Sequence, residues 1–308
     1  MSMPSNQIST YHIPVLLNEC LEGLNINPCG IYVDLTFGGG GHSRAILDRL
    51  NDNGQLFAFD KDKDAINNAI DDDRFCLIND DYSNMTNQLR LYRITRVDGI
   101  LADLGISSHQ IDVADRGFTF RQDSPLDLRM NTDITFTAAD IINGYPEEHI
   151  TKILFSYAEI PNAKQVARMI CRNREQEYIS TTEQLCKILK PLTKPNVENK
   201  FFAKIFQALR IEVNDELTSL DNMLNQCAEI LKPQGRLVVI SYHSLEDKKV
   251  KEVMRCGNTN GKVEKDFYGN INTPYNIVTR KPITPTEEEV LRNSRARSAK
   301  LRIAEKKE

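Results

Sequence analysis

Four consecutive glycines, Gly38–Gly41, lie between an apolar, β-rich run and a segment of helical pattern. Glycines at a strand-to-helix turn let the backbone approach a ligand closely, and they present the N–H groups of the helix N-terminus to it. Four in a row would cost stability at a turn that binds nothing. We therefore expect Gly38, Gly40 and Gly41 to line a ligand site.

The glycines alone do not choose the ligand, because dinucleotides bind at the same turn in doubly wound α/β sheets. The dinucleotide pattern G-x-G-x-x-G/A is not met, since Ser43 or Arg44 stands at the third glycine position. Asp60 ends the next apolar run, where a carboxylate can accept both ribose hydroxyls of an adenosine. This position fits NAD and S-adenosylmethionine equally.

Three carboxylates help to decide between these two cofactors. Asp34, Asp60 and Asp103 each end an apolar run. In an open α/β sheet the ligand crevice lies at the carboxyl ends of the strands, so the three should converge there. They suit the positive sulfonium and amine of S-adenosylmethionine and would repel a pyrophosphate. The sequence favours a methyltransferase, with an NAD-linked oxidoreductase and a non-catalytic RNA-binding protein as alternatives.

Strands and helices that could position these residues alternate over residues 30–105. Strands are predicted at 31–35, 55–60, 75–79 and 97–104, and helices at 42–50, 62–70 and 82–92. Such alternation predicts βαβ units, right-handed crossovers and a parallel sheet.

The alternation stops between residues 111 and 204, where only polar loops and helical stretches occur. It resumes with a long predicted helix at 204–231 and strands at 236–240, 276–279 and 299–303. We therefore predict a discontinuous α/β methyltransferase domain, formed by residues 1–110 and 205–308. Residues 111–204 are predicted to form an inserted helical subdomain.

The composition is that of an ordinary soluble protein, with 40% hydrophobic and 27% charged residues among 308. Residues 1–11 lack a basic start and an apolar stretch, so we expect no signal peptide and a cytoplasmic protein. The seven cysteines show no C-x-x-C pair and the five histidines no H-x-x-x-H pattern, so no metal site is expected. With a net charge of −4, any nucleic-acid binding must come from a local basic patch.

Several strings of residues resemble the bacterial 16S ribosomal RNA cytosine-N4 methyltransferases, RsmH, also called MraW. They are residues 12–17 (HIPVLL), 34–43 (DLTFGGGGHS), 116–120 (RGFTF), 124–130 (SPLDLRM), 241–247 (SYHSLED) and 293–298 (NSRARS). The resemblance spans nearly the whole chain. It implies a class I, Rossmann-like fold and N4-methylation, by S-adenosylmethionine, of a cytidine in the decoding region of 16S ribosomal RNA.

The same resemblance implies which residues touch the cofactor. An aromatic residue lies over the adenine in this family, at the position that corresponds to Tyr82. The implied contacts are Gly40, Gly41, His42, Asp60, Tyr82, Asp103 and Gln110.

Methylation of an amine needs alignment and removal of water rather than a covalent intermediate. Carbon-5 methylation of cytosine would need a cysteine nucleophile, and the only Pro-Cys pair, Pro28-Cys29, precedes the first strand. Because the N4 lone pair is delocalised, acceptors for the amine protons should catalyse the transfer. Asp103 is the first candidate.

Residues 103–106 (DLGI) depart from the D-P-P-Y pattern of many amine methyltransferases, which leaves base stacking unassigned. Phe118, Phe120 and Tyr242 are candidates for stacking. His243 follows the fifth strand and could bind the base or carry a proton. The predicted catalytic group is therefore Asp103, Tyr242 and His243.

Two basic runs could hold RNA phosphates. One comprises Arg292, Arg295, Arg297, Lys300, Arg302, Lys306 and Lys307, and the other Lys187, Lys190, Lys194, Lys200, Lys204 and Arg210. The inserted subdomain would recognise the RNA while one base is turned into the pocket. The expected partner is 16S ribosomal RNA within the small ribosomal subunit, without a membrane. A homodimer is left open, as is a protein, DNA or lipid substrate.

Overall fold

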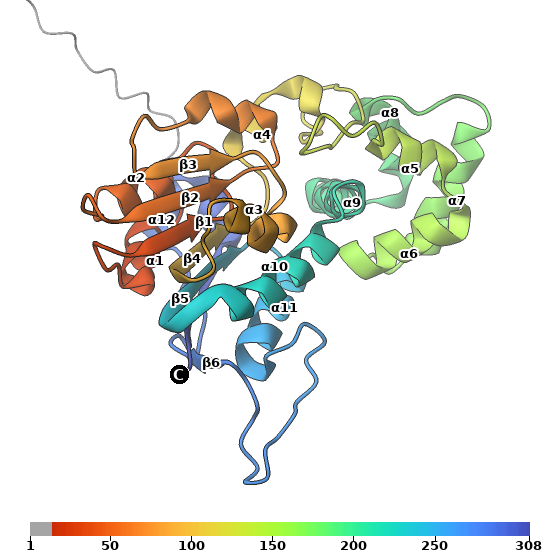
Figure 1. The fold of residues 1–308 in the computed structure, drawn as a ribbon. Coiled ribbons are helices and arrows are strands. Elements are labelled where there is room, and N and C mark those ends of the chain that lie inside the picture. Colours follow the sequence, from red (N-terminus) through yellow and green to blue (C-terminus); the bar gives the residue numbers. More distant parts are fainter. Residues whose placement is uncertain (1–13) are drawn as a thin grey trace, which may run out of the picture. The chain divides into compact units, whose positions relative to one another are not determined.

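A computed structural model describes residues 14–308, which divide into two compact units (Figure 1). The first contains residues up to 60, 64–105 and 223–308, and the second contains 61–63 and 106–222. The predicted polar arm at residues 1–11 and the motif residues His12 and Ile13 lie outside the described residues. Within residues 14–308, no helix has the length and apolarity that a membrane crossing requires.

The first unit is built on a seven-stranded sheet with the order β3-β2-β1-β4-β5-β7-β6. The strands are β1 Ile31–Asp34, β2 Gln55–Phe59, β3 Phe75–Ile78, β4 Val97–Asp103, β5 Leu231–Ser241, β6 Tyr275–Ile277 and β7 Lys300–Lys306. Strands β1 to β5 run parallel, and β7 runs antiparallel to both of its neighbours. The parallel sheet predicted from the sequence is confirmed.

The central strands are short apolar runs because both faces of this part of the sheet are covered. Val33, Ile100 and Val238 are all 0% exposed. The helices of this unit are α1 Leu17–Leu24, α2 Gly41–Leu47, α3 Met85–Leu91, the second half of α10 Glu216–Ile230, α11 Ser244–Cys256 and α12 Glu287–Arg292. Because β1 pairs in parallel with β2 and β4, the carboxyl ends of these three strands lie at the same edge of the sheet, where loops follow them.

Two predicted helices differ from the structure. The segment predicted as a helix at 62–70 forms only a 3-10 helix, Lys63–Asn68, since its asparagine and aspartate side chains favour turns over helix interiors. The long helix predicted at 204–231 is two helices, α9 Glu198–Val213 and α10 Glu216–Ile230. Between them Asp215 adopts a left-handed backbone conformation, with a φ of 47°, that a helix cannot continue through.

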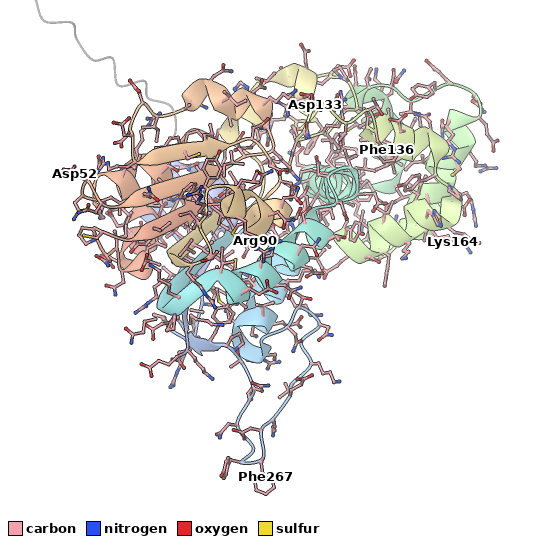
Figure 2. All side chains as sticks on the ribbon, in the orientation of Figure 1. Asp52, Arg90, Asp133, Phe136, Lys164 and Phe267 are labelled. Carbon is pink, nitrogen blue, oxygen red and sulfur yellow. The ribbon has the colours of Figure 1, made fainter. Side chains whose placement is uncertain are left out.

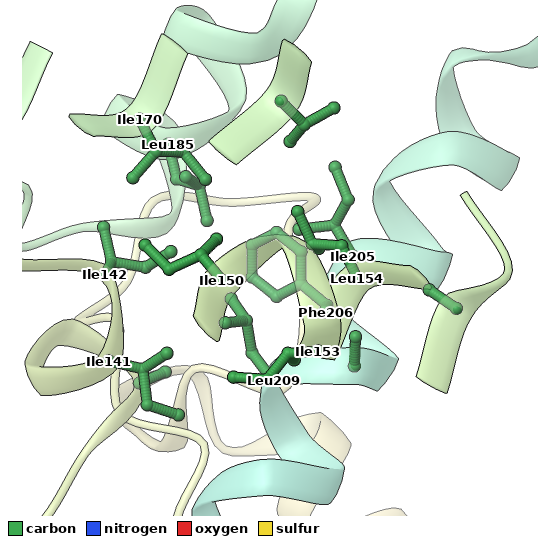
Figure 3. Close-up of a cluster of buried hydrophobic side chains, with 14 of the residues drawn as sticks. Ile141, Ile142, Ile150, Ile153, Leu154, Ile170, Leu185, Ile205, Phe206 and Leu209 are labelled. Atoms are coloured by element: carbon green, nitrogen blue, oxygen red, sulfur yellow. The ribbon is translucent and has the colours of Figure 1, made fainter. Parts of the chain in front are cut away.

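The second unit is helical and has a core of its own. Its helices are α4 Ser108–Asp112, α5 Ala138–Gly144, α6 Glu147–Ala158, α7 Ala163–Arg174, α8 Thr182–Leu189 and α9. Side chains such as Ile142, Leu154, Leu185 and Phe206 meet in one buried cluster (Figure 3). In sequence this unit reaches beyond the predicted 111–204, because it takes in residues 61–63 and continues to Asn222.

A buried ion pair between Arg116 and Asp62 holds separate loop segments of the second unit together. Arg116 donates to Asp62 at 2.9 Å and to the carbonyl oxygens of Arg129 and Met130 at 3.0 and 2.9 Å. Arg116 and Asp62 are only 7% and 5% exposed. The Gln110 amide donates to the same carboxylate at 2.7 Å. The RGFTF motif thus begins with a structural residue.

Replacing Arg116 with alanine should destabilise this unit by about 3–5 kcal/mol, because it leaves the Asp62 carboxylate buried without its charge partner. Urea unfolding followed by circular dichroism measures this. The matched control is Lys187→Ala, which removes an exposed ion pair with Glu183 on α8 and should leave the unfolding curve unchanged. Equal midpoints for the two variants would contradict the structural role of Arg116.

Candidate active site

The glycine loop after β1 has the conformation that its sequence predicts. Gly38 and Gly40 have φ values of 50° and 74°, in the left-handed region that favours glycine. A Cβ added to Gly41 would lie 2.4 Å from Cγ of Pro14, whereas one added to Gly39 would meet no atom within 4 Å. The loop is therefore packed tightly on one side and open on the other, next to the start of α2.

Asp60 fixes the loop from the neighbouring strand. Its carboxylate accepts a hydrogen bond of 2.7 Å from the Gly38 N–H, and the Asn68 amide donates to the Gly38 carbonyl at 3.0 Å. Asp60 follows β2 directly. The carboxylate at this strand end is thus held beside the glycines, where an adenosine ribose is expected in this fold.

Asp34 lies beneath the loop and is 1% exposed. It accepts hydrogen bonds from the Ser43 hydroxyl at 2.6 Å and from the Thr36 N–H at 3.1 Å. Burial raises the pKa of Asp34, and the charge of His42 together with these hydrogen bonds partly offsets the increase. The side chain ties the end of β1 to the first turn of α2.

Asp103 ends β4 and is the most strongly perturbed acid that bears on the predicted chemistry. Its N–H donates to the Thr36 hydroxyl at 2.7 Å, and its carboxylate accepts from the Tyr242 hydroxyl at 2.8 Å. Burial raises the pKa of Asp103 to about 6, although His42 and the Tyr242 hydrogen bond act in the opposite direction. A carboxyl group with such a pKa can exchange a proton near neutral pH.

His42 connects Asp103 to the N-terminal segment. Its Nε2 lies 3.1 Å from the carbonyl oxygen of Val15, and its Nδ1 lies 3.9 Å from the Asp103 carboxylate. A carbonyl oxygen only accepts hydrogen bonds, so Nε2 carries a proton and Nδ1 faces the acid. The orientation of the His42 ring therefore depends on Val15, which lies 27 residues before it in the chain.

Tyr242 and His243 follow β5 and are held by a glutamate. Glu246 accepts from the N–H groups of Tyr242 and His243 at 2.9 and 3.3 Å, and its other oxygen lies 3.1 Å from Nε2 of His243. Glu246 is 4% exposed. This arrangement fixes Tyr242 against Asp103 and places His243 at the beginning of α11.

Tyr82 lies after β3, at the beginning of a 3-10 helix, Tyr82–Asn84. Asp81 starts this helix by accepting from the Ser83 N–H at 2.8 Å. The Tyr82 side chain is half-buried. The structure thus places an aromatic ring on the loop after the third strand, as the sequence predicts.

Other predicted residues lie in the second unit. Gln110 is buried there, with its amide bonded to Asp62. Phe118 is in the helical core, and the ring of Phe120 packs 5.4 Å from that of Phe206. Phe118 is therefore part of that core, and Phe120 is half-buried against it.

Three contributors were missed by the sequence interpretation. Thr36 forms hydrogen bonds with both Asp34 and Asp103. Its position two residues after the end of the first strand could have marked it as a site residue. Glu246 stands three residues after His243, which is the spacing of a capping box. Val15 had no signal beyond the motif in which it stands, because only the folded chain brings its carbonyl to His42.

The sheet order with its antiparallel β7, the glycine loop after β1 and the acid after β2 define a class I S-adenosylmethionine-dependent methyltransferase. The sequence profile of the MraW methylase family matches residues 9–307, so the chain belongs to that family. This membership also removes the alternative of an NAD-linked oxidoreductase. The open side of the glycine loop and the nearby carboxylates of Asp60 and Asp103 fit a cationic adenosine cofactor.

Relatives in other bacteria cover almost the whole chain. The chain is 52% identical over 299 residues to "Ribosomal RNA small subunit methyltransferase H" of Bacteroides fragilis, covering 97% of this chain and 98% of the relative. A protein of the same name from Cytophaga hutchinsonii is 52% identical, covering 96% and 99%. A solved structure of a SAM-dependent O-methyltransferase from Thermotoga maritima matches with a TM-score of 0.40 and 10% identity, covering 94% of this chain and 64% of that one.

Burial of the Asp103 charge predicts a pH-dependent stability. The pKa is about 6 in the folded chain and about 3.9 in an unfolded one, so stability is lost as the pH rises from 4 through 6. Asp103→Asn removes this penalty and keeps an acceptor for Tyr242. Without cofactor, the variant should be more stable than the parent by about 1–3 kcal/mol at pH 8, and equal to it at pH 4. Denaturant unfolding at both pH values measures this, and a less stable variant at pH 8 would contradict the assignment.

Proposed function

We propose that this protein transfers a methyl group from S-adenosylmethionine to N4 of a cytidine in the decoding region of 16S ribosomal RNA. The observation that carries the proposal is the Asp103 carboxyl at the end of β4, oriented by Tyr242 and with a pKa of about 6. The names of the relatives support a ribosomal RNA of the small subunit as substrate. We expect the reaction in the cytoplasm, where small subunits occur.

We further propose how the first unit binds the cofactor. The backbone of Gly38, Gly40 and Gly41 would hold the amino-acid portion, with Asp34 supporting the loop from below. Asp60 would accept the ribose hydroxyls and Tyr82 would cover the adenine. His42 and Asp103 would lie closest to the sulfonium.

The bound cofactor supplies an electrophilic methyl group on a positively charged sulfur. Asp103, as a carboxylate, would accept a hydrogen bond from the N4 amine and take one of its protons as the nitrogen becomes positive. The Tyr242 hydroxyl holds this carboxylate in one orientation, at 2.8 Å. His243, fixed by Glu246, is the proposed contact to the base.

RNA contacts are proposed for only part of the two basic runs, because several of these cations are used within the fold. Arg302 is bonded to Asp247 at 2.7 Å, and Lys306 donates to the carbonyl of Ala228 at 2.7 Å. In the helical unit, Arg210 is paired with Glu216. The exposed cations Arg292, Arg297, Lys194 and Lys200 remain as proposed phosphate contacts.

The proposed function is tested by mass spectrometry of 16S ribosomal RNA from cells that lack the gene. N4-methylcytidine should be absent from the decoding region and should return with the parent gene but not with the Asp103→Asn variant. A methylation pattern that does not change on deletion would overturn the proposal.

Asp60→Ala should weaken binding of S-adenosylhomocysteine by about 1.5–3 kcal/mol, because the ribose hydroxyls lose a charged acceptor. Isothermal titration calorimetry measures the affinity. The Gly38 N–H also loses its partner in this variant, so a thermal melt must show that the first unit remains folded. Unchanged affinity in a folded variant would sink the assignment of Asp60.

Single-turnover methyl transfer at saturating cofactor should fall tenfold per pH unit as the pH drops below the pKa of Asp103, because protonated Asp103 cannot accept the amine proton. This pKa is about 6 without cofactor, and the positive sulfonium should lower it. Asp103→Asn should be slower by roughly two to three powers of ten and should lose this pH dependence. Tyr242→Phe removes a hydrogen bond to the carboxylate and should shift the midpoint to higher pH. A parent profile that stays flat from pH 4 to 8, or one that Asp103→Asn reproduces, would rule out proton acceptance by Asp103.

A further inference from the structure

Three exposed cations form a row on helix α11, which begins directly after His243. Lys248, Lys251 and Arg255 are all exposed. Their spacing of three and four residues places them on one face of the helix, over a length of about 10 Å. The row therefore starts close to the proposed catalytic residues and leads away from them.

Two of the three acidic residues of α11 have partners off this face, while Glu252 stands among the cations, four residues after Lys248 and three before Arg255. Glu246 is bonded to the backbone of Tyr242 and His243, and Asp247 is ion-paired with Arg302 at 2.7 Å. Glu252 lies against Gly261. The outer face of the helix thus presents net positive charge to solvent.

A two-armed loop, residues 258–273, follows α11 and extends from the first unit (Figure 1). Lys265 and Ile271 are bridged across its arms, and the Asn272 N–H donates to the Glu264 carbonyl at 2.7 Å. At the turn, Asp266 accepts from the N–H groups of Tyr268 and Asn270, both at 2.9 Å. These hydrogen bonds give the tip a defined conformation.

Two aromatic side chains occupy the tip. Phe267 is 98% exposed and Tyr268 is 86% exposed, with their rings 5.7 Å apart and nearly perpendicular. Figure 2 shows Phe267 at the far end of the loop. Apart from each other, the two rings are left largely to solvent on a hydrogen-bonded turn. Such exposed aromatic side chains are typical of a binding surface.

We propose that the cationic row of α11 and the 258–273 loop form one RNA-binding surface for the substrate, in which Phe267 and Tyr268 stack on an unpaired base. This inference rests on the proposed function. Lysine and arginine would contact the phosphates, and aromatic rings that accept any base are a common means of holding unpaired RNA. RNA is favoured over a lipid surface because the rings stand beside the polar residues Asp266 and Asn270. The loop that carries them also continues from the helix with the cationic row, which starts close to the proposed catalytic residues.

The phosphate contacts are tested with the full chain carrying Lys248→Gln, Lys251→Gln and Arg255→Gln together. Binding to a 16S ribosomal RNA transcript is measured as a function of salt concentration. The slope of log affinity against log salt should decrease by about two to three, since each contact contributes roughly 0.7–0.9. The matched control carries Arg49→Gln, Arg90→Gln and Arg93→Gln, three exposed arginines elsewhere on the first unit, and should keep the parent slope.

The stacking contact is tested with Phe267→Ala and Tyr268→Ala together. The Kd for the transcript should rise about tenfold or more while the salt slope stays that of the parent, because no charge is removed. Phe267→Tyr with Tyr268→Phe keeps both rings and should bind like the parent. All variants should keep the parent affinity for S-adenosylhomocysteine, which confirms that the first unit is folded.

The outcomes separate this inference from the function on which it rests. A parent chain that neither binds nor methylates the transcript or small ribosomal subunits would overturn both. A parent that does both, with charge and aromatic variants of unchanged Kd and slope, would overturn the surface alone. Sedimentation of the parent with phosphatidylserine vesicles, lost in the aromatic variant while its RNA binding is intact, would show that the tip binds lipid instead.

Discussion

The site depends on the pairing of β1 with β4, which places Asp34 beside Leu101 and brings two strand ends with carboxylates together. Thr36 bonds to both Asp34 and Asp103 and so fixes the distance between the two strand ends. Burial is the main reason why the pKa of Asp103 is raised, and repulsion by the Asp34 carboxylate adds to it. A cationic cofactor would relieve this repulsion. The free energy that the buried charges cost the protein without cofactor would then be recovered as binding free energy.

The remaining parts of the site arrange themselves around that pair. Tyr242 orients the Asp103 carboxylate, and Glu246 in turn fixes the backbone of Tyr242. On the other side, Gly41 allows Pro14 to approach so closely that any side chain there would displace it. The glycines therefore serve packing within the protein as well as access for a ligand.

The cationic side chains of this protein fall into two groups, those paired with acids inside the fold and those exposed on the surface. Arg116, Arg210 and Arg302 are buried or nearly so and are paired with acids, so they belong to the framework of their units. Lys248, Lys251 and Arg255 of α11 are exposed, while Asp247 of the same helix is paired with Arg302. A chain of net negative charge can present a positive surface in this way, because only the local balance decides what a phosphate meets.

The sequence alone determined the parallel sheet, the glycine turn and the acids at the strand ends, because short apolar runs, turn residues and strand-end carboxylates are local signals. It missed the break at Asp215, which depends on a backbone conformation. It also gave no sign that the Phe120 ring packs against Phe206, because that contact depends on the core that the ring enters. Only the tertiary structure decided that Val15 meets His42 and that Tyr242 meets Asp103. Such contacts join residues far apart in the chain, and burial, which sets the pKa of Asp103, exists only once the chain is folded.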